Sequence, residues 1–208
     1  MVAIVDYGVG NLFSLECSLR SIGAEVVITA DPEILKTADQ IILPGVGAFE
    51  DAAKKLRASG LDSVLRDLAA SGKPLMGICL GMQMLFEKSF EYGEHEGLGL
   101  IPGQVVPMEG VIPADYKIPH IGWNALIFKQ DTPLFRYIQP GDCVYFVHSY
   151  YAANCDDAVL ATAEYGPELT AAVAKGNVFG CQFHPEKSGN VGMNILKAFL
   201  EMKEGLVC

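Results

Sequence analysis

The sequence predicts an α/β protein with a doubly wound, mostly parallel sheet and an antiparallel excursion around residues 103–162. From Val2 to Phe86, short apolar runs alternate with helical patterns. This alternation is typical of parallel strands with helices on both faces of the sheet. From residue 103 to residue 162, strand-like runs and turns follow one another with few helix signals. No repeat, linker or low-complexity segment is evident, so we expect one domain over residues 1–208.

The first part of the chain supplies the expected parallel strands. Val2–Val5 is an apolar run bounded by Asp6 and Gly8, which predicts a buried strand. The segment from Asn11 to Ile22 has helical spacing, with leucines on one face and a glycine directly after it as a stop. Further strands are predicted at 26–28, 41–43 and 74–78, and helices at 49–56 and 61–69.

The later elements complete the predicted sheet. Met82 to Phe86 is expected to open a helix, and strand-like runs lie at 104–106, 125–128 and 144–147. The chain is expected to return through strands at 169–173 and 178–183, followed by a last helix from about 191 to 203. Parallel sheets bind ligands at the carboxyl ends of their strands. We therefore expect Val46, Cys79 and His184 at such ends.

Residues 77–81 read Gly-Ile-Cys-Leu-Gly, at the end of the predicted strand 74–78. This pattern is typical of a nucleophile elbow, a sharp turn from strand to helix that exposes its central residue. The flanking glycines leave room for a tight backbone. A helix amino terminus favours the thiolate, which is the nucleophilic form of cysteine. Cys79 is therefore the candidate nucleophile.

A thiol nucleophile needs a base, and the base needs an orienting group. His184 follows the apolar run 178–183, and Glu186, two residues later, can accept a hydrogen bond from its imidazole. His95 lies in a polar, glycine-rich segment and is expected to be solvated. His120 and His148 stay open as alternatives, although neither has a carboxylate beside it in the sequence.

The composition limits the classes of partner. A formal net charge of -10 argues against nucleic acid and against anionic membranes. The amino-terminal segment meets an acid at Asp6 and has no basic region before it, so we expect a first strand and not a signal peptide. No apolar run approaches the length of a membrane span.

The six cysteines show no C-x-x-C spacing, which favours free thiols in a reducing, cytoplasmic compartment. Four of them are expected to be small buried residues: Cys17, Cys143, Cys155 and Cys181. The C-x-x-H spacing of Cys181 and His184 has no second ligand pair, so no metal is expected. Gly8 and Gly10 could begin a dinucleotide fingerprint, but Phe13 occupies its third position, so no cofactor is expected.

Three segments together resemble the class I (triad) glutamine amidotransferases. They are Pro44-Gly45-Val46-Gly47, Gly77-Ile78-Cys79-Leu80-Gly81-Met82-Gln83 and Gln182-Phe183-His184-Pro185-Glu186-Lys187-Ser188. Residues 6–11 and 119–124 narrow the resemblance to the glutaminase subunits of imidazole glycerol phosphate synthases, which serve histidine biosynthesis. The resemblance implies a flavodoxin-like fold and a triad of Cys79, His184 and Glu186 that hydrolyses L-glutamine to glutamate and ammonia.

The resemblance also implies roles for neighbouring residues. Backbone N–H groups at Val46 and Leu80 would form the oxyanion hole, with a peptide flip at Val46 completing it when the partner's substrate is bound. The side chains of Gln83 and Glu91 would hold the amino-acid head of glutamine, together with backbone at Gly47, Ser149 and Tyr150. Without the resemblance, Gln83 would be an ordinary helix residue, Glu91 a solvated carboxylate and residues 44–47 a plain turn.

Ammonia released at this site would be lost to solvent, so a separate acceptor enzyme is expected. The resemblance implies a (β/α)8-barrel cyclase subunit that forms a heterodimer with this chain. It would make imidazole glycerol phosphate and an aminoimidazole carboxamide ribonucleotide. Asn11, Trp123 and Lys187 are expected to face this partner, and tryptophan is typical of interface anchors. A core position for Trp123 is the alternative from the residues alone.

Three other functions stay open from the residues. Another triad glutaminase, serving nucleotide or chorismate chemistry, would differ only in its partner. A stand-alone cysteine hydrolase on the same scaffold would act on amides without a partner. A non-catalytic interaction module would not be expected to keep all three triad residue types.

Overall fold

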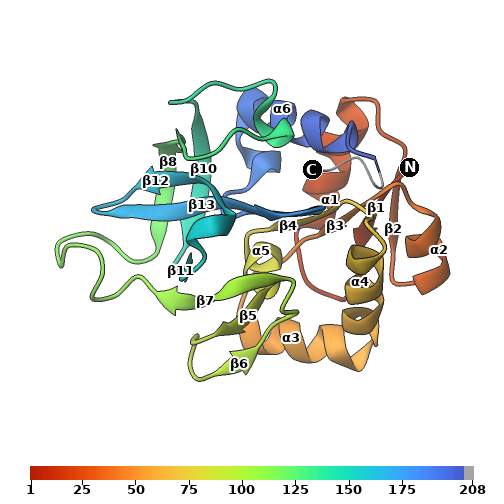
Figure 1. Cartoon of the computed structure of the whole chain (residues 1–208), viewed down its shortest axis with the longest axis horizontal. Coiled ribbons are helices and arrows are strands. Elements are labelled where there is room, and N and C mark those ends of the chain that lie inside the picture. The colour runs from red at the N-terminus through yellow and green to blue at the C-terminus, as the bar shows by residue number, and fades with distance from the viewer. Residues whose placement is uncertain (204–208) are drawn as a thin grey trace.

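The computed structural model describes residues 1–203 and contains an eight-stranded sheet in the order β2-β1-β3-β4-β14-β13-β12-β9 (Figure 1). The strands from β2 to β14 in this order pair in parallel, which confirms the predicted α/β sheet. Their bounds are β1 (Val2–Val5), β2 (Val26–Thr29), β3 (Gln40–Leu43), β4 (Leu75–Ile78) and β14 (Val178–Cys181).

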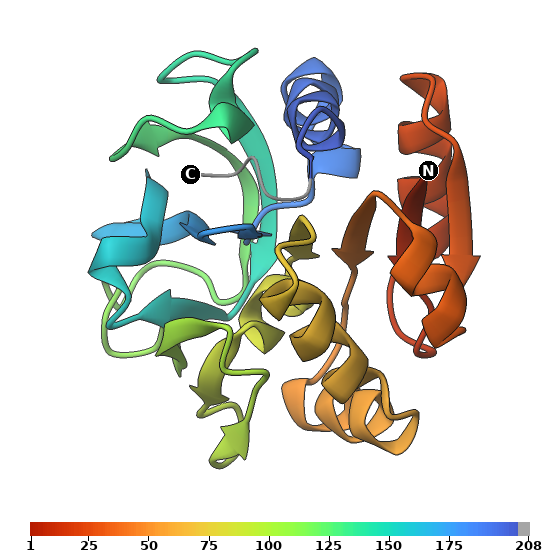
Figure 2. The same cartoon turned by 45° about the vertical axis from the view of Figure 1, so that its right-hand side comes forward.

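Helices cover both faces of this sheet because its central strands are apolar on both sides. In β1, Ala3 and Val5 belong to one core cluster, while Val2 and Ile4 belong to the other. The first cluster packs beneath α2 (Pro32–Thr37), α3 (Phe49–Ala58) and α4 (Leu61–Ala70). The second packs beneath α1 (Leu12–Ser21) and α6 (Gly189–Leu200), which lie side by side (Figure 2).

The ends of α1 show the expected local signals. Asn11 caps its start by accepting a hydrogen bond from the backbone N–H of Ser14 at 3.4 Å. Gly23 stops it with a φ of 86°, a backbone conformation that glycine adopts without strain. The sequence prediction omitted α2, although Asp31 as its cap and Pro32 in its first turn are a readable start signal.

The helix after Cys79 is shorter than expected. α5 spans Leu80–Met84 only, and Phe86 begins strand β5 (Phe86–Ser89) instead of continuing the helix. The backbone N–H of Leu98 bonds to the carbonyl of Met84, and those of Leu100 and Ile101 bond to the carbonyl of Leu85. The N–H groups of residues 98–101 therefore bond to carbonyl groups that would otherwise accept the next hydrogen bonds of the helix.

The antiparallel part is larger than predicted. Within it, β8 (His120–Ala125) pairs with β10 (Cys143–His148), and β11 (Tyr150–Ala153) pairs with β7 (Ile101–Pro107). β7 also pairs in parallel with β5, which continues to β6 (His95–Glu96). The main sheet continues past β14 with β13 (Glu168–Lys175), β12 (Val159–Glu164) and β9 (Ile127–Phe128), and each of these strands pairs antiparallel with the strand before it in the sheet. The antiparallel portion therefore reaches residue 175, not 162.

Residues 85–150, coloured from yellow-green to turquoise, lie on the side of the molecule away from the red amino-terminal elements (Figure 2). Three short 3-10 helices complete the described structure: Pro133–Phe135, Asp156–Ala158 and Pro185–Lys187. Within residues 1–203, no helix has the length and apolar character needed to cross a membrane.

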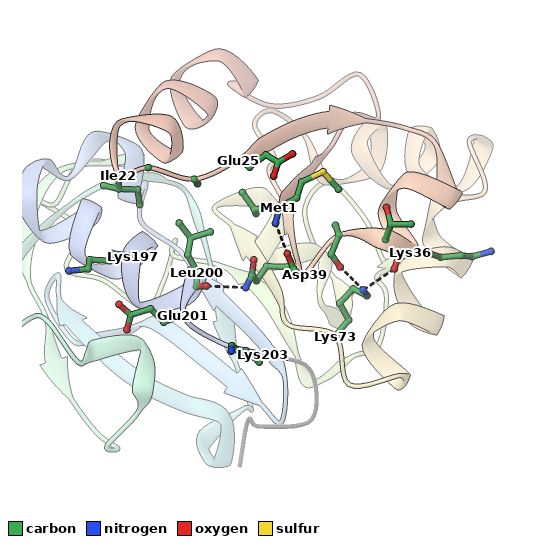
Figure 3. A pocket seen from close by; sticks show the side chains of 16 residues that line it. Met1, Ile22, Glu25, Lys36, Asp39, Lys73, Lys197, Leu200, Glu201 and Lys203 are labelled. Carbon is green, nitrogen blue, oxygen red and sulfur yellow. Dashed lines mark hydrogen bonds and ion pairs between the residues drawn. The ribbon is translucent and has the colours of Figure 1, made fainter.

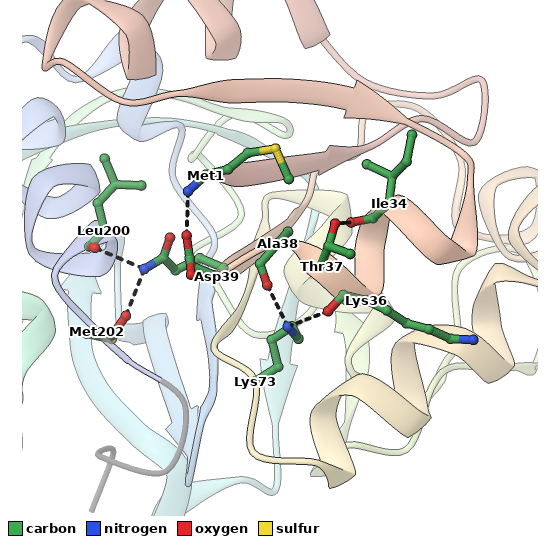
Figure 4. Close-up of polar contacts among 10 residues, drawn as sticks. Met1, Ile34, Lys36, Thr37, Ala38, Asp39, Lys73, Leu200 and Met202 are labelled. Atoms are coloured by element: carbon green, nitrogen blue, oxygen red, sulfur yellow. Dashed lines mark hydrogen bonds and ion pairs between the residues drawn. The ribbon is translucent and has the colours of Figure 1, made fainter.

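A hollow of about 940 Å³ lies at the amino ends of β1 and β3, opposite the edge where α/β sheets bind ligands (Figure 3). Several of its polar groups have partners at the same edge of the sheet. The terminal amine of Met1 pairs with Asp39, and Gln40 Nε2 donates to the carbonyls of Leu200 and Met202 at 3.0 and 2.8 Å (Figure 4). Lys73 Nζ donates to backbone carbonyls of residues 36 and 38. Asp39 thus holds the amino terminus, and its neighbour Gln40 holds the end of α6.

Two of the four cysteines expected in the core are not there. Cys155 and Cys181 are buried, as predicted, but Cys17 and Cys143 are exposed. Cys17 lies on the outer face of α1, whose inner face carries Leu15 and Leu19, and Cys143 begins the edge strand β10. The prediction failed because a residue-type preference cannot tell which face of an element a side chain occupies. Cys208 lies outside the described residues.

Candidate active site

Cys79 has the backbone of a nucleophile elbow. It joins β4 to α5 with φ 55° and ψ -113°, a region that residues with a side chain seldom occupy. A Cβ atom at Gly77 would lie 2.5 Å from the carbonyl oxygen of Gly81, and one at Gly81 would lie 1.9 Å from that of Leu43. The flanking glycines are therefore needed for close backbone packing, as the sequence indicated.

His184 and Glu186 lie next to this elbow. His184 follows β14 and is 2% exposed, and its Nδ1 contacts Glu186 Oε1 at 2.8 Å. Burial alone would lower the pKa of His184. Hydrogen bonds to Cys79 and Glu186 outweigh it and raise that pKa to about 9. The site therefore favours a protonated imidazole between Cys79 and Glu186.

Ten of the predicted site residues line one pocket of about 380 Å³ at the carboxyl ends of the parallel strands. They are Val46, Gly47, Cys79, Leu80, Gln83, Glu91, Ser149, Tyr150, His184 and Lys187. Glu186 contacts His184 from behind and is 3% exposed. The topology places Val46, Cys79 and His184 after β3, β4 and β14, as expected from the parallel sheet.

Gln83 is not an ordinary helix residue, and Glu91 is not a fully solvated carboxylate. Gln83 is 6% exposed, and its Nε2 donates to the Tyr150 carbonyl at 3.3 Å. Glu91 accepts a hydrogen bond from the backbone N–H of Phe49, the first residue of α3. Burial raises the pKa of Glu91, and that hydrogen bond opposes the shift. Both side chains are thus fixed at the pocket wall.

The other histidines have structural partners. His120 Nδ1 contacts His148 Nε2 at 3.0 Å, His148 Nδ1 contacts the Tyr150 carbonyl oxygen at 2.8 Å, and His120 Nε2 contacts Asn124 Oδ1 at 2.7 Å. Burial lowers the pKa of His148 to about 4. His148 lines the pocket, but hydrogen bonds occupy both its ring nitrogens, so His184 is the better candidate base.

His95 is not solvated as predicted. Its side chain is 18% exposed, and its Nε2 is buried without a hydrogen-bond partner among the described residues. The short β5–β6 pairing draws this segment against the molecule, and a polar local composition gave no sign of that pairing.

Three site features escaped the sequence reasoning. Gln182 Nε2 donates to Cys79 Sγ at 3.9 Å, and the Cys79 thiol lies 3.9 Å from the Val147 carbonyl. Tyr7 donates from its buried hydroxyl to the Pro44 carbonyl at 2.7 Å, directly before the 45–47 turn. Burial and the neighbouring Cys79 raise the pKa of Tyr7. Gln182 and Tyr7 both stand within the matched motif segments, which was the available signal.

The residues expected at an interface lie in different settings. Asn11 caps α1, Lys187 lines the pocket and Trp123 is 55% exposed on β8. Trp123 is therefore not a core residue. Phe13 and Ile121 on the same elements are 74% and 59% exposed. Within residues 1–203, no group of three or more His, Cys, Asp or Glu side chains is arranged to hold a metal ion.

Sequence comparison agrees with this geometry. The family model for class-I glutamine amidotransferases matches residues 3–202. The imidazole glycerol phosphate synthase subunit HisH of Caldanaerobacter subterraneus subsp. tengcongensis is 51% identical over 97% of this chain and 98% of its own length. The subunit of the same name from Lactococcus lactis is 48% identical over 96% of this chain and 98% of its own length.

Solved structures agree on the fold. A glutamine amidotransferase crystal structure superposes with a TM-score of 0.75 at 22% identity, over 97% of this chain and 98% of that one. The PurLQS structure from Thermotoga maritima gives a TM-score of 0.72 at 23% identity, over 96% of each chain. The sheet, the elbow and a family match that spans almost the whole sequence lead to one conclusion: this chain belongs to the class-I glutamine amidotransferases.

Proposed function

We propose that this chain is the glutaminase subunit of an imidazole glycerol phosphate synthase in histidine biosynthesis. It hydrolyses L-glutamine and passes the ammonia to a cyclase subunit. The observation that carries the proposal is one pocket that joins the Cys79–His184 pair to Gln83, Glu91 and the Val46–Gly47 turn. Relatives about half identical over nearly their whole length bear that subunit's name.

The geometry supports a covalent mechanism. His184 takes the proton of Cys79, and the thiolate attacks the side-chain carbonyl carbon of glutamine. The C–N bond then breaks, His184 gives its proton to the leaving nitrogen, and ammonia departs from a thioester. Water, deprotonated by His184, cleaves the thioester to glutamate and restores the thiol. Glu186 orients His184 and stabilises its cation throughout.

The tetrahedral intermediates need donors for their oxyanion. The Leu80 N–H, directly after the nucleophile, is the first donor of a nucleophile elbow. Val46 supports a second donor because it lines the pocket and is 42% exposed. Gly47 follows with a φ of 93°, a backbone conformation that glycine adopts without strain. We assign completion of the hole to a reorientation at Val46.

The partner completes the proposal. Ile121 and Trp123 are exposed on β8, Phe13 is exposed on α1, and Asn11 and Lys187 lie at the start of α1 and at the pocket. Exposed aromatic side chains of this kind suit an interface more than a solvated surface. We assign this surface to a (β/α)8-barrel cyclase, the heterodimer to the cytoplasm, and one glutamine amidotransferase domain to residues 1–208.

A reconstitution experiment tests the function. Glutamine hydrolysis is measured for the purified chain alone, with the candidate cyclase, and with the cyclase plus its ribulosyl-formimino ribonucleotide ligand. The expected result is low activity alone and strong activity in the full complex, with imidazole glycerol phosphate as product. Full activity without the cyclase would favour a stand-alone hydrolase. Stimulation by another synthase and not by the cyclase would show that the chain is a triad glutaminase with a different partner.

A further inference from the structure

Gln182 has no role in the mechanism described above, yet its side chain is fully buried at the centre of the site. It follows β14, two residues before His184, and is 0% exposed. Burial of an amide costs free energy unless its polar atoms are hydrogen-bonded, and an apolar side chain of the same size would avoid that cost. The partners of this amide therefore indicate what it does.

One end of the Gln182 amide faces the nucleophile. Its Nε2 group donates to Cys79 Sγ at 3.9 Å. A thiolate accepts such a hydrogen bond more strongly than a thiol, because charge-assisted hydrogen bonds are about twice as strong as neutral ones. The contact therefore stabilises the reactive form of Cys79 more than the resting form, and it does so without bringing another charge into the site.

The other end of the amide orients Gln83. Gln83 Nε2 donates to Gln182 Oε1 at 3.0 Å and to the Tyr150 carbonyl at 3.3 Å. An amide nitrogen has two hydrogens, so both are committed to these acceptors. The carbonyl oxygen of Gln83 is then the atom left to face a ligand. A carbonyl oxygen accepts hydrogen bonds, so Gln83 suits the α-ammonium of an amino acid and not its carboxylate.

We propose that Gln182 is a positioning residue that holds the Cys79 thiolate and aims the Gln83 carbonyl at the α-ammonium of the substrate. The inference rests on the proposed function, because it states how the same pocket activates and selects glutamine. The ionisable groups that face Cys79 are His184 and Tyr7, and Glu186 and His148 act through His184. Gln182 adds an uncharged donor to this set.

The first test measures the nucleophile without any substrate. Full-length wild-type chain is compared with Gln182→Met, Gln182→Glu and the matched control Gln40→Met. Gln40 is a buried amide too, 6% exposed, but it bonds backbone carbonyls at the opposite edge of the sheet. Iodoacetamide modification is followed by peptide mass spectrometry for Cys79 alone, because Cys17 and Cys143 are exposed.

The expected result is a shift in the pH of half-maximal Cys79 alkylation. It rises by about one unit in Gln182→Met, the scale of one lost hydrogen bond to a charged group. It rises further in Gln182→Glu, where a carboxylate faces Sγ, and stays unchanged in Gln40→Met. If Gln182→Met does not fold by circular dichroism, the isosteric Gln182→Glu carries the test. An unchanged profile in the folded Gln182 variants overturns the proposal.

The second test measures glutamine hydrolysis in the complex with the cyclase. In Gln182→Met, Gln83 loses an acceptor, so KM for glutamine rises about tenfold, the scale of one lost hydrogen bond. In Gln182→Glu, the carboxylate still accepts from Gln83, so kcat falls while KM stays near the wild-type value. Equal KM increases in both variants overturn the assignment for Gln83. An alkylation shift without glutamine hydrolysis by the wild-type complex leaves the Cys79 contact in place and overturns the proposed function instead.

Discussion

At the scale of single residues, the elbow makes Cys79 replaceable for folding but not for chemistry. The strain of its φ of 55° is in the backbone, so Cys79→Ala keeps the same conformation and removes only the sulfur. We expect no measurable glutamine hydrolysis and an unchanged circular dichroism spectrum. A thiol-reactive glutamine analogue should label Cys79 and spare the exposed Cys17 and Cys143. Equal labelling of all three, or surviving activity, would contradict the role of Cys79 as nucleophile.

The His184–Glu186 pair gives a second residue-scale prediction, for stability against pH. The pKa of His184 is about 9 in the folded chain, above the ordinary value of 6.5. Hydrogen bonds to Cys79 and to Glu186 raise this pKa, so the stabilisation that these contacts give is fully present below about pH 6.5 and is lost as the pH rises through about 9. Glu186→Gln should lower the melting temperature at pH 6, by about 2–4 °C for each kcal/mol lost in a chain of this size. The difference should shrink by pH 10.

The same pair has a matched functional readout. His184→Asn should lose nearly all glutamine hydrolysis, whereas Glu186→Gln should lose less, because it orients the base and transfers no proton. With ammonium salts supplied in place of glutamine, the complex should still make product with either variant. If Glu186→Gln lowers the melting temperature equally at pH 6 and pH 10, the stabilisation does not depend on a protonated His184 beside Glu186.

At the scale of elements, the strand–turn–helix unit around Cys79 depends on close backbone contact. A Cβ at Gly81 would lie 1.9 Å from the Leu43 carbonyl oxygen, so Gly81→Ala must push β3 and α5 apart. Overpacking in a core typically costs about 1–3 kcal/mol, and a backbone obstacle puts this case at the upper end. Urea unfolding measures the loss. Gly23→Ala is the control, because nothing lies within 4 Å of its Cβ and only its φ of 86° is strained.

Element prediction succeeded where local pattern decides the outcome and failed where distant pairing does. Buried strands such as Val2–Val5 can be recognised in the sequence as apolar runs. Helix α1 lies between Asn11 and Gly23, as predicted. The helix that was expected to start at Met82 ends before Phe86, because N–H groups of residues 98–101 bond to the carbonyls of Met84 and Leu85. The motif residues were readable from their spacing. The Gln182 contacts were not, because they join side chains separated by about a hundred positions in the sequence.

At the scale of the whole molecule, the two edges of the sheet have different tasks. The amino ends of the strands carry separate polar contacts of Asp39, Gln40 and Lys73, of which the Gln40 contacts reach the end of α6 (Figure 4). The carboxyl ends carry the pocket, the elbow and the His184 base. The polar contacts at the first edge support the fold, and the hydrogen bonds to His184 at the second edge raise its pKa. Substitutions at the two edges should therefore separate stability from activity.

The last prediction concerns coupling between the subunits. An incomplete oxyanion hole withholds stabilisation from the transition state, and one missing donor typically costs about 10²–10³ in kcat. We expect the isolated chain to hydrolyse glutamine that much more slowly than the complex with the cyclase and its ligand. Trp123→Ala removes an exposed indole that does not line the pocket, so it should weaken complex formation in calorimetric titration and leave the isolated chain's activity unchanged. Lys36→Ala, at the opposite edge, is the control and should bind normally. If Trp123→Ala binds the cyclase as tightly as the wild type, Trp123 is not part of the interface. If the isolated chain is as active as the complex, the cyclase does not stimulate glutamine hydrolysis.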